Sequence, residues 1–114
     1  MKLNYHPTLT EEKWATFSTS QQILMIANEL NRAGNWIAKS DFSEAKLCYE
    51  RAMELLFLTI ATLKDHKKLR ELLRFKEMLA TLYAKDVLSN SENSSLLKAL
   101  ILLDKGSFQL LETV

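Results

Sequence analysis

The chain has few residues of the kinds that catalyse reactions or hold metal ions. It contains two histidines, His6 and His66, and one cysteine, Cys48. A histidine can act as a general base near neutral pH, but the sequence LKDHKK around His66 indicates an exposed turn. No Glu-x-x-His pair is present, which excludes the inward-facing ligands of a di-iron carboxylate bundle. We therefore expect no enzymatic activity, no cofactor and no metal.

Two further groups could support chemistry, and both have simpler interpretations. Glu50 and Glu54 lie one helical turn apart, and Lys46 stands one turn before Glu50, so this pattern favours a solvated, charge-laced face. Cys48 lies among aliphatic residues with no histidine beside it, which predicts a packed, inert thiol. The chain's two glycines stand far apart, so no glycine-rich phosphate loop is present.

A basic cluster between Lys64 and Lys76 holds six Lys or Arg residues against two acidic ones, a local excess of four positive charges. Lys67, Arg70 and Arg74 recur at helical spacing, so they share one side of a helix. The cluster allows a solvated face, a site for an acidic partner peptide, or an RNA contact. Because the net charge is only +1 and no exposed aromatics are interleaved, nucleic acid is the least favoured partner.

The elements that position these residues are helices. The chain has 114 residues, of which 47% are apolar, with two glycines and one proline, a composition typical of long helices around one core. Apolar residues at three- and four-residue steps predict an all-α, up-down four-helix bundle with helices at about 19–39, 42–64, 67–88 and 96–112. A short helix at about 10–17 and an arm at 1–9 precede it, and 10–114 form one domain. The polar stretch SNSENSS, residues 89–95, predicts a loop.

Local signals refine this picture. Three patterns of Ser, Thr or Asp followed three residues later by Glu or Gln predict capping boxes: Thr8 with Glu11, Ser18 with Gln21, and Asp41 with Glu44. Whether the first helix runs on or breaks at Ser18 stays open. Gly34 is expected to let another helix approach closely. The expected core residues of the first long helix and of the third are Ile23, Ile26, Ala27, Leu30, Ala33 and Ile37, and Leu69, Leu72, Leu73, Phe75, Leu79, Leu82 and Tyr83.

The stretch from Asp41 to Lys64 is the densest apolar segment and is expected to be the central helix. Its second half, Met53 to Leu63, is apolar in nearly every direction, as is Leu96 to Leu103. This surplus predicts a groove or a dimer face. Trp36 lies one turn after Arg32, a spacing that allows a cation–π contact. The candidate partner-binding residues are Trp36, Phe57, Leu58, Lys67, Arg70 and Arg74.

Residues 33–57, around AKSDFSEAKLCYERAMEL, resemble a single tetratricopeptide-type helical hairpin. The resemblance rests on Ala33 and Trp36 in the first helix and on Phe42, Ala45, Tyr49 and Ala52 in the second. No second copy follows, and Phe57 stands where that unit usually has a proline, so a repeat array is excluded. Residues 20–85 are similar to the microtubule-interacting and trafficking domain, which implies a surface groove that holds partner helices. The segment FKEMLATLYAKDVL resembles the helical chaperones of flagellar export.

These observations predict a non-enzymatic helical protein-interaction module. Its partner is either a second copy of the chain, forming a homodimer, or an amphipathic segment of a client. The alternative is a small nucleotide- or RNA-associated helical domain that partners a nucleotidyltransferase or toxin. A single cysteine and an N-terminus without a signal-peptide core predict a cytoplasmic protein. The longest nearly uncharged run has nine residues, too few to cross a membrane.

Overall fold

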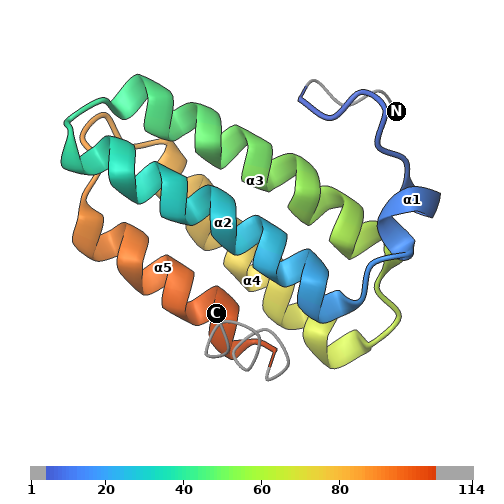
Figure 1. The fold of residues 1–114 in the computed structure, drawn as a ribbon. Coiled ribbons are helices and arrows are strands. Elements are labelled where there is room, and N and C mark those ends of the chain that lie inside the picture. Colours follow the sequence, from blue (N-terminus) through green and yellow to red (C-terminus); the bar gives the residue numbers. More distant parts are fainter. Residues whose placement is uncertain (1–4, 105–114) are drawn as a thin grey trace.

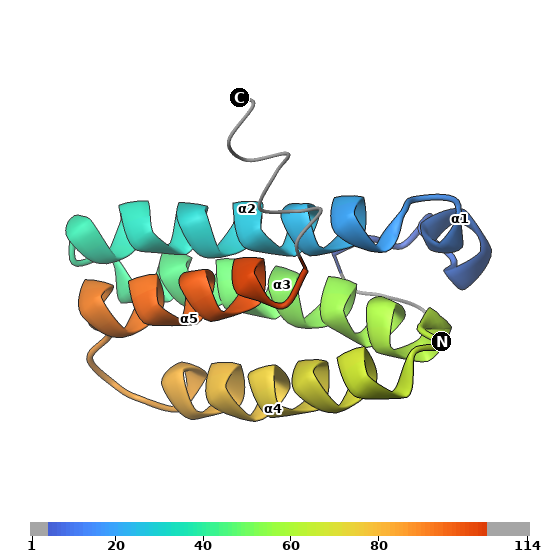
Figure 2. The same ribbon diagram turned by 90° about the horizontal axis from the view of Figure 1, so that it is seen from below.

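The computed structural model describes residues 5–104, which form five helices and no strand. These are α1 (Glu11–Ala15), α2 (Thr19–Ala38), α3 (Phe42–Thr62), α4 (His66–Tyr83) and α5 (Asn90–Leu102). The four long helices run alternately up and down around one core (Figure 1). Helix α2 packs on α3 and α5, and α4 packs on the same two helices from the other side (Figure 2). The predicted all-α, up-down four-helix bundle is confirmed.

Helices α2 and α3 begin at the caps that the sequence predicts. The Ser18 hydroxyl accepts the backbone N–H of Gln21 at 3.1 Å, and the Gln21 side chain accepts that of Ser18 at 2.9 Å. This reciprocal box separates α1 from α2, which settles the question left open above. The Asp41 carboxylate accepts the N–H of Glu44 at 3.1 Å and so begins α3.

Helix α1 is short and attaches to α3 through one buried side chain. The indole N–H of Trp14 donates to the hydroxyl of Thr59 at 2.9 Å, and that hydroxyl donates to the Leu55 carbonyl at 2.9 Å. The predicted cap at Thr8 is wrong. Thr10 caps α1 instead, because its side chain accepts the backbone N–H three residues later at 3.1 Å.

The turn between α2 and α3 is a tight C-terminal cap. Ser40 adopts a left-handed backbone conformation with φ of 59°. Its N–H donates to the Ile37 carbonyl at 2.9 Å, and the N–H of Asp41 donates to the Trp36 carbonyl at 2.9 Å. This is the Schellman pattern, with serine at the position that glycine usually takes. It reverses the chain in a few residues and sets α2 and α3 antiparallel.

Helix α4 ends earlier than predicted. It begins at His66, where the Asp65 carboxylate accepts two backbone N–H groups of the first turn, and it ends at Tyr83 rather than at residue 88. The residues that follow turn the chain back toward the bundle. Leu88 in this connection is buried, so burying its side chain fixes the connection against the core.

The predicted loop at 89–95 is wrong, because most of it forms the first half of α5. Ser89 caps the helix by accepting the backbone N–H of Glu92 at 3.4 Å. Ser89 and Glu92 have the spacing of a capping box, a signal that the polar composition obscured. The helix ends at Leu102, with Leu103 as its C-cap, although the sequence predicts that it continues. The rest of the predicted helix, through Gly106 to residue 112, lies outside the described residues.

The polar start of α5 is tied to the core by Asn93. This residue is buried, its Nδ2 donates to the Leu30 carbonyl at 3.0 Å, and its Oδ1 accepts the Tyr49 hydroxyl at 2.7 Å. A Cβ added at Gly34 would lie 3.1 Å from Asn93 Nδ2. The close approach expected at Gly34 is therefore confirmed, and α5 is the helix that makes it.

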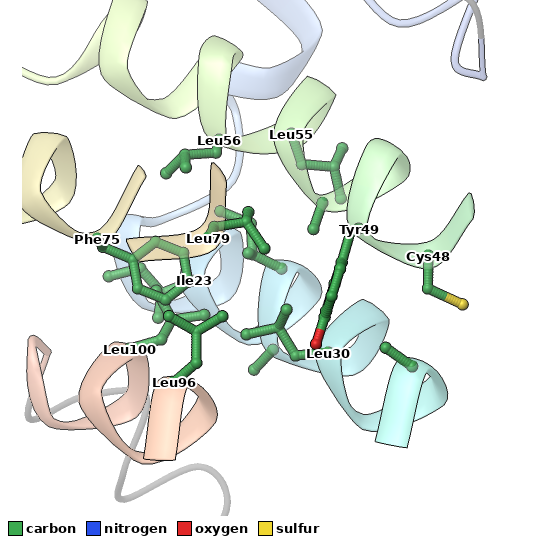
Figure 3. Packing of buried hydrophobic residues seen from close by; sticks show 14 of the residues in the cluster. Ile23, Leu30, Cys48, Tyr49, Leu55, Leu56, Phe75, Leu79, Leu96 and Leu100 are labelled. Atoms are coloured by element: carbon green, nitrogen blue, oxygen red, sulfur yellow. The ribbon is translucent and has the colours of Figure 1, made fainter. Parts of the chain in front are cut away.

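The core lies between the four long helices, and Figure 3 shows Tyr49 reaching from α3 toward Leu30 on α2. All six expected core residues of α2 are buried. On α4, Leu72, Phe75 and Leu79 are buried, but Leu73 is exposed and its predicted core position is wrong. The reason is geometric, since α4 packs only on α3 and α5 and therefore buries a narrow stripe.

Candidate functional site

A groove lies between α4 and α5, which run side by side at one edge of the bundle (Figure 2). It consists of two cavities of about 320 and 190 Å³ that share Met78. Its α4 wall is formed by Glu71, Arg74, Phe75, Met78, Thr81 and Leu82, and its α5 wall by Ser91, Glu92, Ser95, Leu96, Ala99 and Leu103. We call this surface the α4–α5 groove.

The two walls are stripes along their helices. Within each wall, residues recur at steps of one, three or four, which keeps them on one broad side of a helix. From Glu71 to Leu82 the α4 wall covers about three turns, roughly 17 Å. The groove is therefore as long as a short helix.

Large apolar side chains at the groove are open to solvent. Met78 forms part of both cavities and is 47% exposed. Leu102 is 73% exposed and follows the groove residue Ala99 by three positions, which places it beside the α5 wall. Burying a fully exposed apolar side chain gains about 1.5–3 kcal/mol, so covering the exposed half of Met78 gains roughly 1 kcal/mol. This surface can therefore drive the binding of an apolar partner.

Two hydroxyl groups of the groove are engaged by their own helices. Thr81 donates to the Glu77 carbonyl at 2.9 Å, and Ser95 donates to the Ser91 carbonyl at 3.0 Å. No histidine or cysteine is among the residues that line the two cavities. The walls combine apolar side chains with the charged groups of Glu71, Arg74 and Glu92.

One end of the groove is basic. Arg74 lines the smaller cavity, and Lys67 and Arg70 precede it on the same side of α4. All three side chains are exposed, and none forms an ion pair within the described range 5–104. The other end differs, because the Lys85 ammonium pairs with the Glu92 carboxylate there. The groove thus has a positive end and a charge-balanced end.

The chain matches no known family. Comparisons with protein-family models, with curated proteins and with solved structures all find no match. Among the described residues, no helix is both long enough and apolar enough to cross a membrane. The geometry of the groove is therefore the main observation that bears on function.

Only one of the six predicted partner-binding residues lines the groove, and that residue is Arg74. Lys67 and Arg70 lie near it on α4. Phe57 is on α3 and is 41% exposed, whereas Leu58 is only 3% exposed. Leu58 points into the core, so its side chain presents no binding surface in this conformation.

Trp36 lies near the end of α2, away from the residues that line the groove, and is packed partly against the core. The Lys39 ammonium sits over its ring at 5.1 Å from the centroid. Arg32, the cation that the spacing suggested, pairs instead with Glu29 at 3.0 Å. The contact between Arg32 and Trp36 that the spacing allowed is therefore not formed, and Lys39 takes the place over the ring.

The sequence predicts surplus apolar surface on Met53 to Leu63 and on Leu96 to Leu103, and the second of these segments forms part of the groove. Leu96, Ala99 and Leu103 line the α5 wall, and Leu102 beside them is exposed. The bundle covers most of Met53 to Leu63. Met78 was not predicted, because the outer side of α4 mixes threonine with charged residues and no apolar period marks it.

Outside the groove, a polar cluster of Tyr5, His6, Glu50, Glu54 and Tyr83 joins the N-terminal arm to α3. Glu50 accepts the hydroxyl of Tyr5 at 2.6 Å and that of Tyr83 at 2.9 Å. Glu54 accepts the Tyr5 backbone N–H at 3.0 Å and lies 2.8 Å from His6 Nδ1. The hydrogen bond to Glu50 raises the pKa of Tyr83. The face predicted to be solvated is thus partly covered by the arm, and its carboxylates hold the arm in place.

Cys48 is buried and lies beside Arg51, whose Nη2 is 3.2 Å from the sulfur. Burial raises the pKa of the thiol, although Arg51 opposes this effect. Figure 3 shows the sulfur pointing away from Tyr49. A buried thiol with a raised pKa is a poor nucleophile at neutral pH. Within residues 5–104, no three His, Cys, Asp or Glu side chains are grouped to hold a metal ion.

Proposed function

We propose that this protein is a non-enzymatic helical interaction module that binds an amphipathic helical segment of another protein in the α4–α5 groove. The observation that carries the proposal is the exposure of Met78 at the junction of the two cavities. Other exposed apolar side chains, such as Phe57 on α3, line neither cavity, whereas Met78 lies where the two cavities meet, so a partner can cover it from within a groove.

A helix suits this groove better than an extended strand. An extended peptide docks by pairing with a sheet edge, and the described residues contain no strand to offer one. Two neighbouring helices present ridges and grooves between which a third helix packs at about 8–10 Å. A segment with apolar residues at i, i+3, i+4 and i+7 would place them over about two turns, within the three-turn length of the groove.

The sequence resemblances support the same proposal. Residues 33–57 resemble a tetratricopeptide-type hairpin, and residues 20–85 are similar to a domain that holds partner helices in a surface groove. The chaperone-like segment, from Phe75 to Leu88, includes Met78. The single cysteine fits a reducing compartment, so the proposal places the module in the cytoplasm.

The test uses a displayed library of peptides with leucine fixed at i, i+3, i+4 and i+7 and the outer positions randomised. We expect the native chain to select binders, and Met78→Glu to weaken their binding at least tenfold because it puts a charge on the apolar wall. Met25→Glu is the matched control, since Met25 is an exposed methionine on α2, outside the groove. Equal binding by the two variants would contradict the proposal.

The homodimer version is tested separately by light scattering. If the groove serves a client, the chain stays monomeric from micromolar to hundreds of micromolar concentration. If the mass doubles and Met78→Glu restores the monomer, the partner is a second copy. The protein would then be a homodimer rather than a binder of a client segment.

A further inference from the structure

The basic end of the α4–α5 groove carries positive charges that neighbouring carboxylates do not fully neutralise. Lys67, Arg70 and Arg74 have no ionic partner within residues 5–104. Their neighbour Lys68 differs, because its ammonium lies 2.8 Å from the carboxylate of Asp104. Helix α4 thus pairs one cation with Asp104, just after the end of α5, and leaves four others exposed, of which Lys67, Arg70 and Arg74 lie toward the groove.

Three of the unpaired cations of α4 lie on the side that faces the groove, whereas Lys76 lies outside it. Lys67 and Arg74 are seven residues apart, so they lie on one side of α4, and Arg74 is itself part of the wall. From Asp65 to Arg74, with Lys68 paired to Asp104, the cations Lys67, Arg70 and Arg74 stand against the carboxylates of Asp65 and Glu71, which leaves an excess of one positive charge. Helix α4 begins at His66, so the positive end of its dipole lies at the same end.

We infer that the segment held in the α4–α5 groove is an acidic amphipathic helix whose Asp or Glu residues gather at the end beside Lys67, Arg70 and Arg74. This inference rests on the proposed function and adds the charge of the partner and its register. Leucine-like side chains of the segment enter the two cavities at Met78. Its carboxylates meet the cations of the α4 wall, which supply specificity and a faster encounter.

Two other occupants fit the observations less well. RNA would leave the apolar wall unused, and the exposed part of the groove offers no aromatic ring for base stacking, since Phe75 is buried. A second copy would bring its own three cations to the same interface, and like charges facing each other disfavour association.

The experiment combines the peptide library with a matched pair of charge reversals. Arg74→Glu changes a cation on the wall, and Lys76→Glu changes an exposed cation on the same helix that does not line the groove. Binding of the selected peptides is followed by fluorescence anisotropy in 50 and 300 mM salt, and circular dichroism checks that each variant is folded. A single-stranded 20-nucleotide RNA is titrated alongside the peptides.

The inference predicts enrichment of Asp and Glu at one end of the selected peptides. Arg74→Glu should weaken their binding about tenfold and Lys76→Glu less than twofold, and higher salt should weaken it further. Replacing the peptide's acidic residues with lysine should have an effect as large as Arg74→Glu.

Each contrary outcome has a distinct meaning. If Met78→Glu abolishes binding and Arg74→Glu leaves it unchanged, the charge inference is overturned and the proposed function stands. If no peptide binds in a way that depends on Met78, both the proposed function and the charge inference are overturned. RNA binding that Arg74→Glu removes and Met78→Glu spares would overturn the inference in favour of an RNA contact. A mass that doubles through this groove would overturn it in favour of a second copy.

Discussion

The Tyr49 hydroxyl donates a 2.7 Å hydrogen bond to Asn93 Oδ1 and so joins α3 to α5 through the interior of the bundle. The same amide donates to the Leu30 carbonyl on α2, so one side chain connects three helices. Both partners are buried. In the low dielectric of a core, a fully satisfied polar link fixes one arrangement of helices against the alternatives. It therefore also fixes the position of α5, which forms one wall of the groove.

Asn93→Ala should lower the free energy of unfolding by about 2–3 kcal/mol. The substitution removes two buried hydrogen bonds and leaves the Tyr49 hydroxyl without its partner. Urea denaturation measures the effect. Ser94→Ala is the control, because Ser94 is exposed next to Asn93 and its loss should cost less than about 0.5 kcal/mol. Similar losses in the two variants would mean that the Asn93 link contributes little.

Gly34→Ala should destabilise the chain by about 1 kcal/mol, although alanine is the better helix former by about that amount. The new Cβ would meet Asn93 Nδ2 at 3.1 Å, and crowding a packed site costs about 1–3 kcal/mol. In an Asn93→Ala background the Asn93 amide that the new Cβ would meet is absent. The same substitution should then stabilise the chain by up to about 1 kcal/mol. A double-mutant cycle in urea tests this reversal of sign, and additive effects would contradict it.

Alkaline pH should destabilise the bundle through Tyr49. Burial, with smaller contributions from Glu92 and Cys48, raises the pKa of Tyr49 to about 12. The folded state therefore keeps the proton that the unfolded state loses near pH 10. The stabilisation is complete below pH 10 and falls by about 3 kcal/mol as the pH rises to about 12.

Tyr49→Phe removes this titration. Urea midpoints at pH 8, 10 and 11.5 should fall less steeply for the variant than for the native chain. Tyr5 and Tyr83, whose pKa values are also raised, remain in both proteins and set the common background. Parallel curves would show that Tyr49 does not dominate the alkaline loss of stability.

Thr59→Val should weaken the attachment of α1. The buried indole N–H of Trp14 would lose its acceptor, at a cost of about 2 kcal/mol in the free energy of unfolding. Thr62→Val is the matched control on the same helix, because the Thr62 hydroxyl bonds only to backbone carbonyls of its own helix. The control should change stability by less than about 0.5 kcal/mol. The measurement is thermal unfolding followed by tryptophan fluorescence.

The sequence predicted the fold well where an apolar period coincided with a clear cap. Helix α2 has both, since Ser18 and Gln21 form its capping box and its apolar stripe is buried in full. The start of α5 was predicted wrongly, because successive serines and asparagines are typical of a loop. The burial of Asn93 depends on a partner, Tyr49, that is 44 residues away in sequence. No local pattern carries that information.

The candidate site was predicted less well than the fold. The cations of α4 were recognised, because charge spacing is visible in one helix. The surplus apolar surface of Leu96 to Leu103 was also predicted, and it lines the α5 wall. Its pairing with Met78 on α4 was not predicted, since a groove is a relation between two helices and α4 has no unusual apolar stripe. Phe57 and Leu58 were predicted as partner-binding residues because their segment is apolar on nearly every side. Packing buries Leu58, and Phe57 is exposed on α3, which does not line the groove.

The most direct test of the groove is to map the backbone amide shifts of the isotopically labelled chain by NMR as a selected acidic peptide is titrated in. We predict that the largest changes gather on α4 from Glu71 to Leu82 and on α5 from Ser91 to Leu103. Changes should be small on α1 and on the N-terminal half of α2. Shifts centred on Phe57 or Trp36, or spread evenly over the bundle, would contradict the central claim that the α4–α5 groove is the binding surface.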